Sequence, residues 1–314
     1  MTVRLGVVGL GGIAQKAYLP VLSRLETVEV AAVSSRRPET VERICRQYRW
    51  PRGAGTLAEL KSLKLDAAIV LTPSPTHFGI VRELLEAGLD ILVEKPATLS
   101  SRETATLGEL AERRGRVLMV AFNRRYAPLY RQARELLAGR NSALCIAEKH
   151  RAGAAHASLQ ENYIDDTIHM IDLVRWFGGE GHAVTTSSRV RDGKLVEAAS
   201  VVAYESGGIG IVATSLEAGG WQERVILHGE RLTVEVEAFR QLRVIREERQ
   251  ELLGGETAGQ WTSDLYGRGF VPLLEHFVEC VRTRQTPQTS AWEAFRTQVL
   301  LEDMVAHNVG SLEN

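Results

Sequence analysis

The chain has 314 residues, more than one hydrophobic core usually serves, so its length favours two domains. A hydrophobic share of 44% and a charged share of 25% are typical of a globular protein, and a formal net charge of -1 offers no field to gather nucleic acid or an anionic membrane. The three cysteines lie far apart without a Cys-x-x-Cys spacing, which excludes a disulfide framework. We therefore expect a cytoplasmic protein with no signal peptide, no metal and a small-molecule partner.

Residues 1–122 alternate short apolar runs with helical patterns. This alternation predicts an α/β domain, a Rossmann doubly wound parallel sheet buried on both faces. The predicted strands cover residues 4–8, 29–34, 66–71, 90–93 and 117–121. The predicted helices cover residues 13–25 with a break at Pro20, 38–48, a segment ending at Gly88, and 100–115, which starts at a capping box of Ser100 and Glu103.

Residues 123–314 have a different pattern, in which strand signals follow one another directly. They predict an α+β domain with an open, predominantly antiparallel sheet, whose final helices could pack back on the first domain. The predicted strands cover residues 143–150, 183–190, 195–204, 209–216, 222–228, 231–236 and 242–246. The predicted helices cover residues 128–138, 163–177, 271–283 and 290–307.

A glycine-rich turn, "GLGGIAQ", follows the first predicted strand and opens the first predicted helix. It places Gly9, Gly11 and Ala14 at the spacing G-x-G-x-x-A within a β-α-β unit. Here the first glycine permits a tight turn, the second lets the backbone approach a pyrophosphate, and Ala14 keeps helix and strand close. Free N–H groups at the helix start attract phosphate. The pattern favours dinucleotide binding over a purely structural turn.

The end of the second predicted strand distinguishes NAD from NADP. NAD-binding proteins usually place an acidic residue there for the ribose 2′-OH, whereas this chain has Ser34, Ser35, Arg36 and Arg37. Hydroxyls and a guanidinium would hold a 2′-phosphate that a carboxylate would repel. We predict NADP as the preferred cofactor and NAD as the alternative. The arginines could also be merely solvated.

The tripeptide Glu94-Lys95-Pro96 follows the predicted strand 90–93. Ligands of open α/β sheets bind outside the carboxyl ends of the strands, so Lys95 is expected to point into the cofactor crevice. Its ammonium group could polarise a carbonyl or stabilise an alkoxide. The alternative is a surface lysine that pairs with Glu94.

The helix predicted over residues 163–177 carries Asp165, His169 and Asp172 at i, i+4 and i+7, on one face. A carboxylate one turn from a histidine can fix its tautomer and raise its basicity, which would make His169 a usable acid or base near neutral pH. A metal-ligating pair and an ordinary polar helix face are the alternatives. For His77, in "TPSPTHF", we expect a structural role near the cofactor.

Five motifs, in this order, resemble those of the Gfo/Idh/MocA oxidoreductase family. They are "GVVGLGGIAQ", "TPSPTHF", "EAGLDILVEKPAT", "VAFNRRYAP" and "DDTIHMIDLVRWF". The resemblance is strongest to the MviM-type branch of the family. It implies a Rossmann domain, a second domain whose sheet makes a homodimer or homotetramer, Lys95 beside nicotinamide and substrate, and an acid-base pair at Asp165 and His169.

One feature differs from the family's usual pattern, and another adds to it. The family often has glycines where this chain reads "ENYIDDTIH", and Thr167 takes the place of the glycine that lies two residues before the histidine. The run Lys149-His150-Arg151 could favour an anionic substrate, but we expect these side chains to be solvated.

The resemblance implies an NAD(P)-dependent oxidoreductase that transfers hydride to or from a sugar, cyclitol or similar polyol. An NAD-dependent glycoside hydrolase with internal redox chemistry and a non-catalytic cofactor-binding sensor are the alternatives. The predicted catalytic residues are Lys95, His169 and Asp165. The predicted cofactor-binding residues are Gly9, Gly11, Gly12, Ile13, Ala14, Ser34, Ser35, Arg36, Thr72, Pro73, His77, Glu94 and Lys95.

Overall fold

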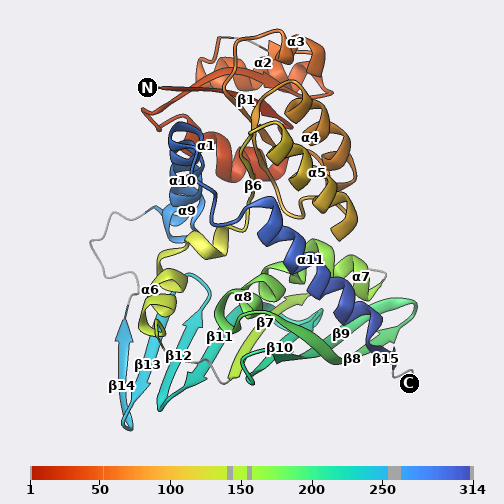
Figure 1. The fold of residues 1–314 in the computed structure, drawn as a ribbon, viewed down its shortest axis with the longest axis vertical. Coiled ribbons are helices and arrows are strands. Elements are labelled where there is room, and N and C mark those ends of the chain that lie inside the picture. Colours follow the sequence, from red (N-terminus) through yellow and green to blue (C-terminus); the bar gives the residue numbers. More distant parts are fainter. Residues whose placement is uncertain (1, 52, 140–143, 154–157, 254–262, 312–314) are drawn as a thin grey trace. The chain divides into compact units, whose positions relative to one another are not determined.

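The computed structural model describes residues 2–51, 53–139, 144–153, 158–253 and 263–311 (Figure 1). The chain forms two compact units. One comprises Met1–Asn123 and Gly269–Phe295, and the other comprises Arg124–Arg268 and Arg296–Asn314. The N-terminal segment of the first unit ends at Asn123, one residue after the expected end of the first domain at residue 122.

The first unit is built on a six-stranded parallel sheet in the order β3-β2-β1-β4-β5-β6. Its strands are β1 (Val3–Val8), β2 (Val28–Ser34), β3 (Gly53–Ala54), β4 (Ala67–Val70), β5 (Asp90–Val93) and β6 (Leu118–Val120). The strand order reverses direction between β1 and β4, the point at which sheets of this class bind their ligands. The predicted Rossmann fold is confirmed.

Helices accompany this sheet, as Figure 1 shows. They are α1 (Leu19–Leu22), α2 (Pro38–Tyr48), α3 (Leu57–Lys61), α4 (His77–Glu86), α5 (Ser101–Arg113), α10 (Phe270–Thr283) and the start of α11 (Ala291–Ala306). Ser100 caps α5 by accepting a hydrogen bond from the Glu103 backbone N–H at 3.3 Å, as predicted. The helix expected over residues 13–25 is instead a π-helical turn, Ala14–Tyr18, followed by α1. Pro20 lies in the first turn of α1, where its missing N–H is tolerated.

The second unit contains a nine-stranded sheet in the order β14-β13-β12-β11-β7-β10-β9-β8-β15. Among the described strands of this sheet, only the pairs β7–β10 and β8–β15 are parallel. The strands are β7 (Leu144–Ala152), β8 (Gly181–Arg191), β9 (Lys194–Tyr204), β10 (Ile209–Ser215), β11 (Glu217–Gly229), β12 (Leu232–Glu237), β13 (Gln241–Arg246), β14 (Arg249–Leu253) and β15 (Asn308–Ser311). The predominantly antiparallel sheet is therefore confirmed.

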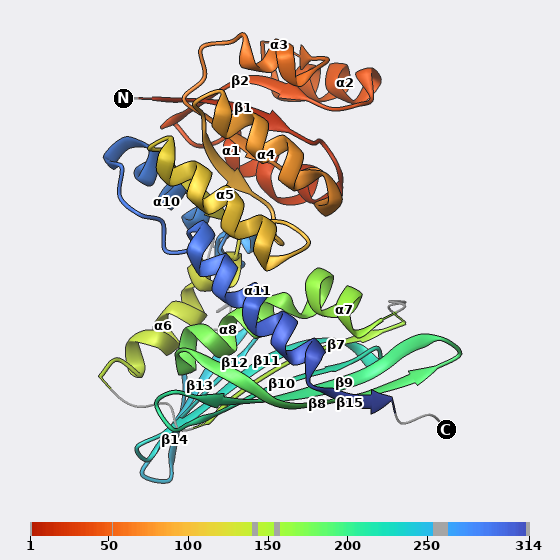
Figure 2. The same ribbon diagram turned by 45° about the vertical axis from the view of Figure 1, so that its right-hand side comes forward.

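One face of this sheet carries helices (Figure 2). They include α6 (Pro128–Leu136), α7 (Leu159–Asn162) and α8 (Ile168–Gly178), while α9 (Asp264–Gly267) follows later in the chain. The helix predicted over residues 163–177 is interrupted, because a π-helical turn at Tyr163–Thr167 joins α7 to α8. Such turns often occur at functional sites. This one contains Asp165, a predicted catalytic residue, and its neighbour Asp166.

Candidate functional site

The glycine turn after β1 leaves its backbone open on one side and tightly packed on the other. Gly9 has φ +98°, and a Cβ there would lie 2.6 Å from the backbone carbonyl carbon of Leu71, so only glycine fits between β1 and β4. At Gly11 and Gly12 an added Cβ would have no heavy atom within 4 Å, and both residues are exposed. The turn continues directly into the helical segment that begins at Gly12. This arrangement fits a pyrophosphate against exposed backbone N–H groups.

The ends of neighbouring strands bring four predicted residues to one edge of the first sheet. Gly9 donates a backbone hydrogen bond to Ser34, Leu71 donates to Val8, and Glu94 donates to Val70, at 2.7–2.9 Å. Gly9, Ser34, Thr72 and Lys95 thus lie at what we call the carboxyl edge of the sheet. The side chain of Ser34 is buried, Ser35 is half-buried, and Arg36 is exposed.

Glu94 fixes the segment that carries Lys95. Its carboxylate accepts a hydrogen bond from the Tyr18 hydroxyl at 2.7 Å and another from the Lys95 backbone N–H at 2.8 Å. Tyr18 is fully buried, and burial together with the Glu94 charge raises the pKa of its hydroxyl well above the ordinary value. Lys95 itself is half-buried. The Lys95 backbone is therefore held by Glu94, and Glu94 in turn is held by the buried Tyr18, a residue that the prediction of the tripeptide did not include.

His77 is buried and connects two loops of the carboxyl edge. Its Nδ1 lies 2.8 Å from the Pro96 carbonyl oxygen, and its Nε2 lies 2.8 Å from the Thr72 carbonyl oxygen. A neutral imidazole carries one N–H, so only one of these contacts can be a donated hydrogen bond in that form. The position links the loop after β4 to the loop that carries Lys95. This geometry agrees with a structural role.

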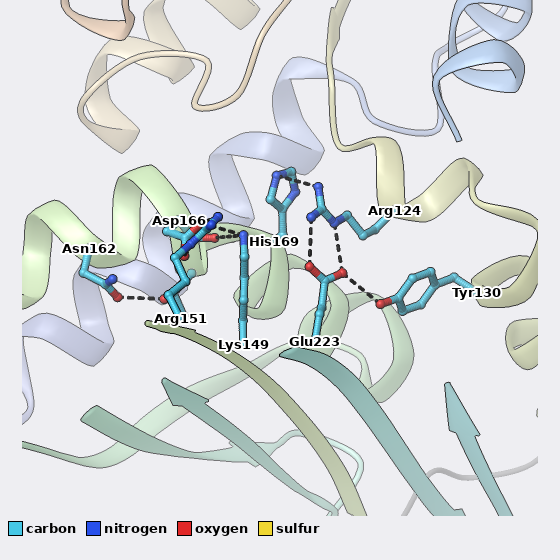
Figure 3. A network of polar contacts seen from close by, with 9 residues as sticks. Arg124, Tyr130, Lys149, Arg151, Asn162, Asp166, His169 and Glu223 are labelled. Carbon is cyan, nitrogen blue, oxygen red and sulfur yellow. Dashed lines mark hydrogen bonds and ion pairs between the residues drawn. The ribbon is translucent and has the colours of Figure 1, made fainter. Parts of the chain in front are cut away.

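A second polar site lies inside the second unit, between the sheet and its helices (Figure 3). Lys149 on β7 and Glu223 on β11 are directly paired in the sheet and are each 2% exposed. Side chains of the η3 turn (Asn123–Tyr126), α6, the π-helical turn and α8 meet them there. We call this set the charged cluster. It comprises Arg124, Tyr130, Lys149, Arg151, Asp166, His169 and Glu223.

One half of the charged cluster centres on Arg124. Its guanidinium donates to both carboxylate oxygens of Glu223, with Nε–Oε1 at 3.1 Å and Nη2–Oε2 at 2.8 Å, and its Nη1 lies 3.0 Å from His169 Nε2. The Tyr130 hydroxyl donates to the same Glu223 carboxylate at 3.0 Å. Burial alone would raise the pKa of Glu223, but the Arg124 charge and hydrogen bonds outweigh it and lower that pKa.

The other half centres on Asp166. Lys149 Nζ lies 2.7 Å from its carboxylate, and Arg151 donates two hydrogen bonds to it at 2.5 and 2.6 Å. Burial would raise the pKa of Asp166, but Arg151 and Lys149 together hold it well below its usual range. Burial and the nearby Arg124 charge lower the pKa of Lys149 to about 8. The expectation that Lys149 is solvated is wrong, because strand alternation turns it to the covered face of the sheet.

The predicted helix face is only partly assembled. His169 is 5% exposed and contacts Arg124, whereas Asp165 is exposed. Asp172 is buried and pairs with Arg125 at 2.7 Å. The catalytic role of Asp165 therefore remains a prediction.

Sequence reasoning missed Arg124, Asp166 and Glu223. Arg124 lies in the motif "FNRRYAP", but nothing local in the sequence connects this arginine with a glutamate 99 positions later.

Both units now point to the same class of protein, an oxidoreductase with an NAD-binding Rossmann domain. Residues 3–122 match the model of the oxidoreductase family with NAD-binding Rossmann fold, and residues 163–307 match that of its C-terminal alpha/beta domain. The chain belongs to the Gfo/Idh/MocA oxidoreductase family, which confirms the predicted resemblance.

In the described part of the chain, no group of His, Cys, Asp and Glu side chains is arranged to hold a metal. No helix there is long and apolar enough to cross a membrane.

Relatives of the chain cover nearly its whole length. The protein YceM of Salmonella typhimurium is 33% identical over 304 residues, which are 96% of each chain. The scyllo-inositol 2-dehydrogenase (NAD(+)) of Bacillus subtilis is 25% identical over 91% of this chain and 88% of its own. The crystal structure of the dehydrogenase MviM from Clostridium difficile is similar at a TM-score of 0.89, with 25% identity over 96% of this chain and 98% of that one.

Proposed function

We propose that this protein is an NAD(P)-dependent dehydrogenase, with NADP preferred, that acts on a carbinol or carbonyl carbon of a sugar, cyclitol or similar polyol. The observation that carries the proposal is the carboxyl edge, where the open backbone at Gly11 and Gly12 and the ammonium-bearing Lys95 follow neighbouring strands of one sheet. The similarity to a scyllo-inositol dehydrogenase supports the substrate class.

A bound NADP or NAD would supply the nicotinamide ring that accepts or donates the hydride in the proposed reaction. Lys95 donates a hydrogen bond to the substrate oxygen and stabilises negative charge on it. His169 takes the hydroxyl proton during oxidation and returns it during reduction, while the carboxylate of Asp165 stabilises its charged form. Ser34, Ser35 and Arg36 would hold the 2′-phosphate of NADP.

The test is a screen of polyols and sugars with NAD+ and with NADP+, read as the absorbance change of the nicotinamide. We expect at least one substrate to be oxidised by the wild-type protein. Lys95→Met and His169→Ala should each abolish turnover, while the binding of NADPH, followed by fluorescence, should change little. Full activity of both variants would overturn the assignment of the two residues.

Two other functions predict different results in the same experiment. A glycoside hydrolase that oxidises and re-reduces its substrate would release sugar without a net absorbance change, and a cofactor-binding sensor would bind NADPH without any turnover. We further propose that the protein is cytoplasmic and forms a homodimer or homotetramer through the sheet of the second unit.

A further inference from the structure

The contact between Arg124 and His169 identifies which imidazole nitrogen carries the proton. A guanidinium has only donor groups and stays charged at any relevant pH. Since Arg124 Nη1 lies 3.0 Å from His169 Nε2, the nitrogen must be the acceptor of this hydrogen bond. His169 is therefore neutral while the contact exists, and its proton is on Nδ1, a buried atom that makes no hydrogen bond within the described part of the chain.

Several contacts hold Arg124 in this position. Its Nε and Nη2 are both engaged by Glu223, so that only the Nη1 side of the guanidinium faces the imidazole (Figure 3). The side chain of Glu223 is 0% exposed and that of Arg124 is 12% exposed. The Tyr130 hydroxyl fixes the carboxylate from the other side, and the Phe239 ring lies 5.4 Å from the guanidinium carbon. A buried, doubly hydrogen-bonded arginine of this kind has few other conformations available.

We propose that Arg124 is a positioning residue for the acid-base chemistry of His169, keeping the imidazole neutral with Nε2 as the proton acceptor, and that Glu223 and Tyr130 form the support which holds Arg124 there. This inference rests on the proposed function for its catalytic consequence. The tautomer itself is a property of the resting protein.

The other charged groups of the second unit show in which direction Arg124 shifts the proton affinity of His169. Lys149 on β7 and Arg124 carry positive charge, whereas Glu223 on β11 and Asp166 of the π-helical turn carry negative charge. Arg151 neutralises part of Asp166. Asp165 of the π-helical turn is exposed, and Asp172 of α8 is neutralised by Arg125. Of these charged groups, the Arg124 guanidinium is the one that contacts His169 Nε2. Its positive charge opposes the binding of a second proton to the imidazole ring.

A substrate hydroxyl can use this arrangement without disturbing the support. Its O–H would replace Arg124 Nη1 as the donor to Nε2, while Nε and Nη2 remain on Glu223. When the proton then moves from the hydroxyl to Nε2, the imidazolium lies near a guanidinium. The proton is therefore held weakly, and its return to an alkoxide or its release to solvent is favoured.

The direct test is the side-chain ¹⁵N spectrum of His169 in the full-length protein without substrate, assigned by comparison with His169→Gln. We expect an unprotonated Nε2 and a protonated Nδ1 near neutral pH. In Arg124→Leu the titration midpoint of His169 should move upward by about one pH unit, a tenfold gain in proton affinity. Glu223→Gln should move it downward, because it removes a negative charge and leaves the arginine.

Arg224→Leu is the matched control. Arg224 is the next residue on β11, where its side chain pairs with Glu148 and Glu235, so the midpoint should not move. A wild-type proton on Nε2, or equal midpoints in all three variants, would overturn the inference. If Arg124→Leu does not fold, the double variant with Glu223→Gln is compared with Glu223→Gln alone, and the same upward shift is expected.

This readout needs no turnover, so it is independent of the substrate screen. Where a substrate is found, the acid limb of the kcat/KM profile should shift in the same direction as each midpoint. A loss of activity with an unshifted limb would show that Arg124 only maintains the fold. A correct tautomer without any turnover would count against the proposed function and leave the positioning of His169 intact.

Discussion

The carboxyl edge and the charged cluster are both polar, but they are held by different interactions. The carboxyl edge is set mainly by backbone: parallel strands, a turn at Gly9 and hydrogen bonds between successive strand ends. The charged cluster is set by side chains that come from segments as far apart as Arg124 and Glu223 and pair in a buried space. A backbone site is sensitive to added volume, whereas a cluster of buried ion pairs is sensitive to the loss of a single charge.

The largest expected effect is on stability, and it tests the carboxyl edge, the site that is set by backbone. Gly9→Ala places a methyl group 2.6–2.7 Å from backbone atoms of Leu71 and Thr72, at a φ of +98°. Strain and overpacking should together lower the free energy of unfolding by about 3 kcal/mol or more, measured by urea denaturation.

Gly12→Ala is the control, since its methyl group would meet no heavy atom within 4 Å. Its stability should be close to that of the wild type, while the affinity for NADPH should fall because the methyl group enters the space proposed for the pyrophosphate. Equal stability of the two variants would mean that the close approach of β1 to β4 is not what requires Gly9.

The difference between the two sites also explains what could be predicted from sequence. The carboxyl edge follows from local patterns, because each strand end is adjacent in sequence to the residues it presents, such as Gly9 and Lys95. Parallel pairing then brings those ends together without further information. The sheet class of the second unit was also predicted from local patterns, because its strand signals follow one another directly along the chain.

The charged cluster could not be predicted in this way. Helical spacing pointed to Asp165, but the π-helical turn changes the register of the helix and buries Asp166 instead. The partner of Arg124 depends on the pairing of β7 with β11, which sets Glu223 beside Lys149. Register between strands 74 positions apart has no local signal in a single sequence, so charge patterns alone suggested a solvated Lys149.

The second prediction tests the charged cluster, the site that is set by side chains. Asp166→Asn removes the negative charge shared by Lys149 and Arg151, and it should lower the free energy of unfolding at pH 7 by about 3 kcal/mol. The folded pKa of Asp166 is below its usual value, so its stabilisation is present above about pH 4 and is lost as the pH falls toward the folded pKa. The difference between variant and wild type should therefore shrink below pH 4.

The measurement is urea denaturation over a range of pH, with Glu29→Gln as the control. Glu29 pairs with Arg4 on the surface, where both side chains are nearly half exposed, so its loss should cost less than about 1 kcal/mol. An Asp166→Asn variant as stable as this control would show that the cluster tolerates its unbalanced cations. A difference that stays constant down to pH 2 would assign the effect to packing and not to the carboxylate charge.

The smallest expected effect is on cofactor binding at the carboxyl edge, at the arginine proposed to hold the 2′-phosphate. Arg36→Ala should weaken NADPH binding about tenfold, or about 1.4 kcal/mol, and leave NADH binding unchanged, because only NADPH carries a 2′-phosphate. Fluorescence titration of both nucleotides measures this, with Arg46→Ala, an exposed arginine of α2, as the control. Equal losses for NADPH and NADH would place Arg36 outside the 2′-phosphate site. In that case the buried hydroxyl of Ser34 and the half-buried one of Ser35 would have to provide any preference for NADP.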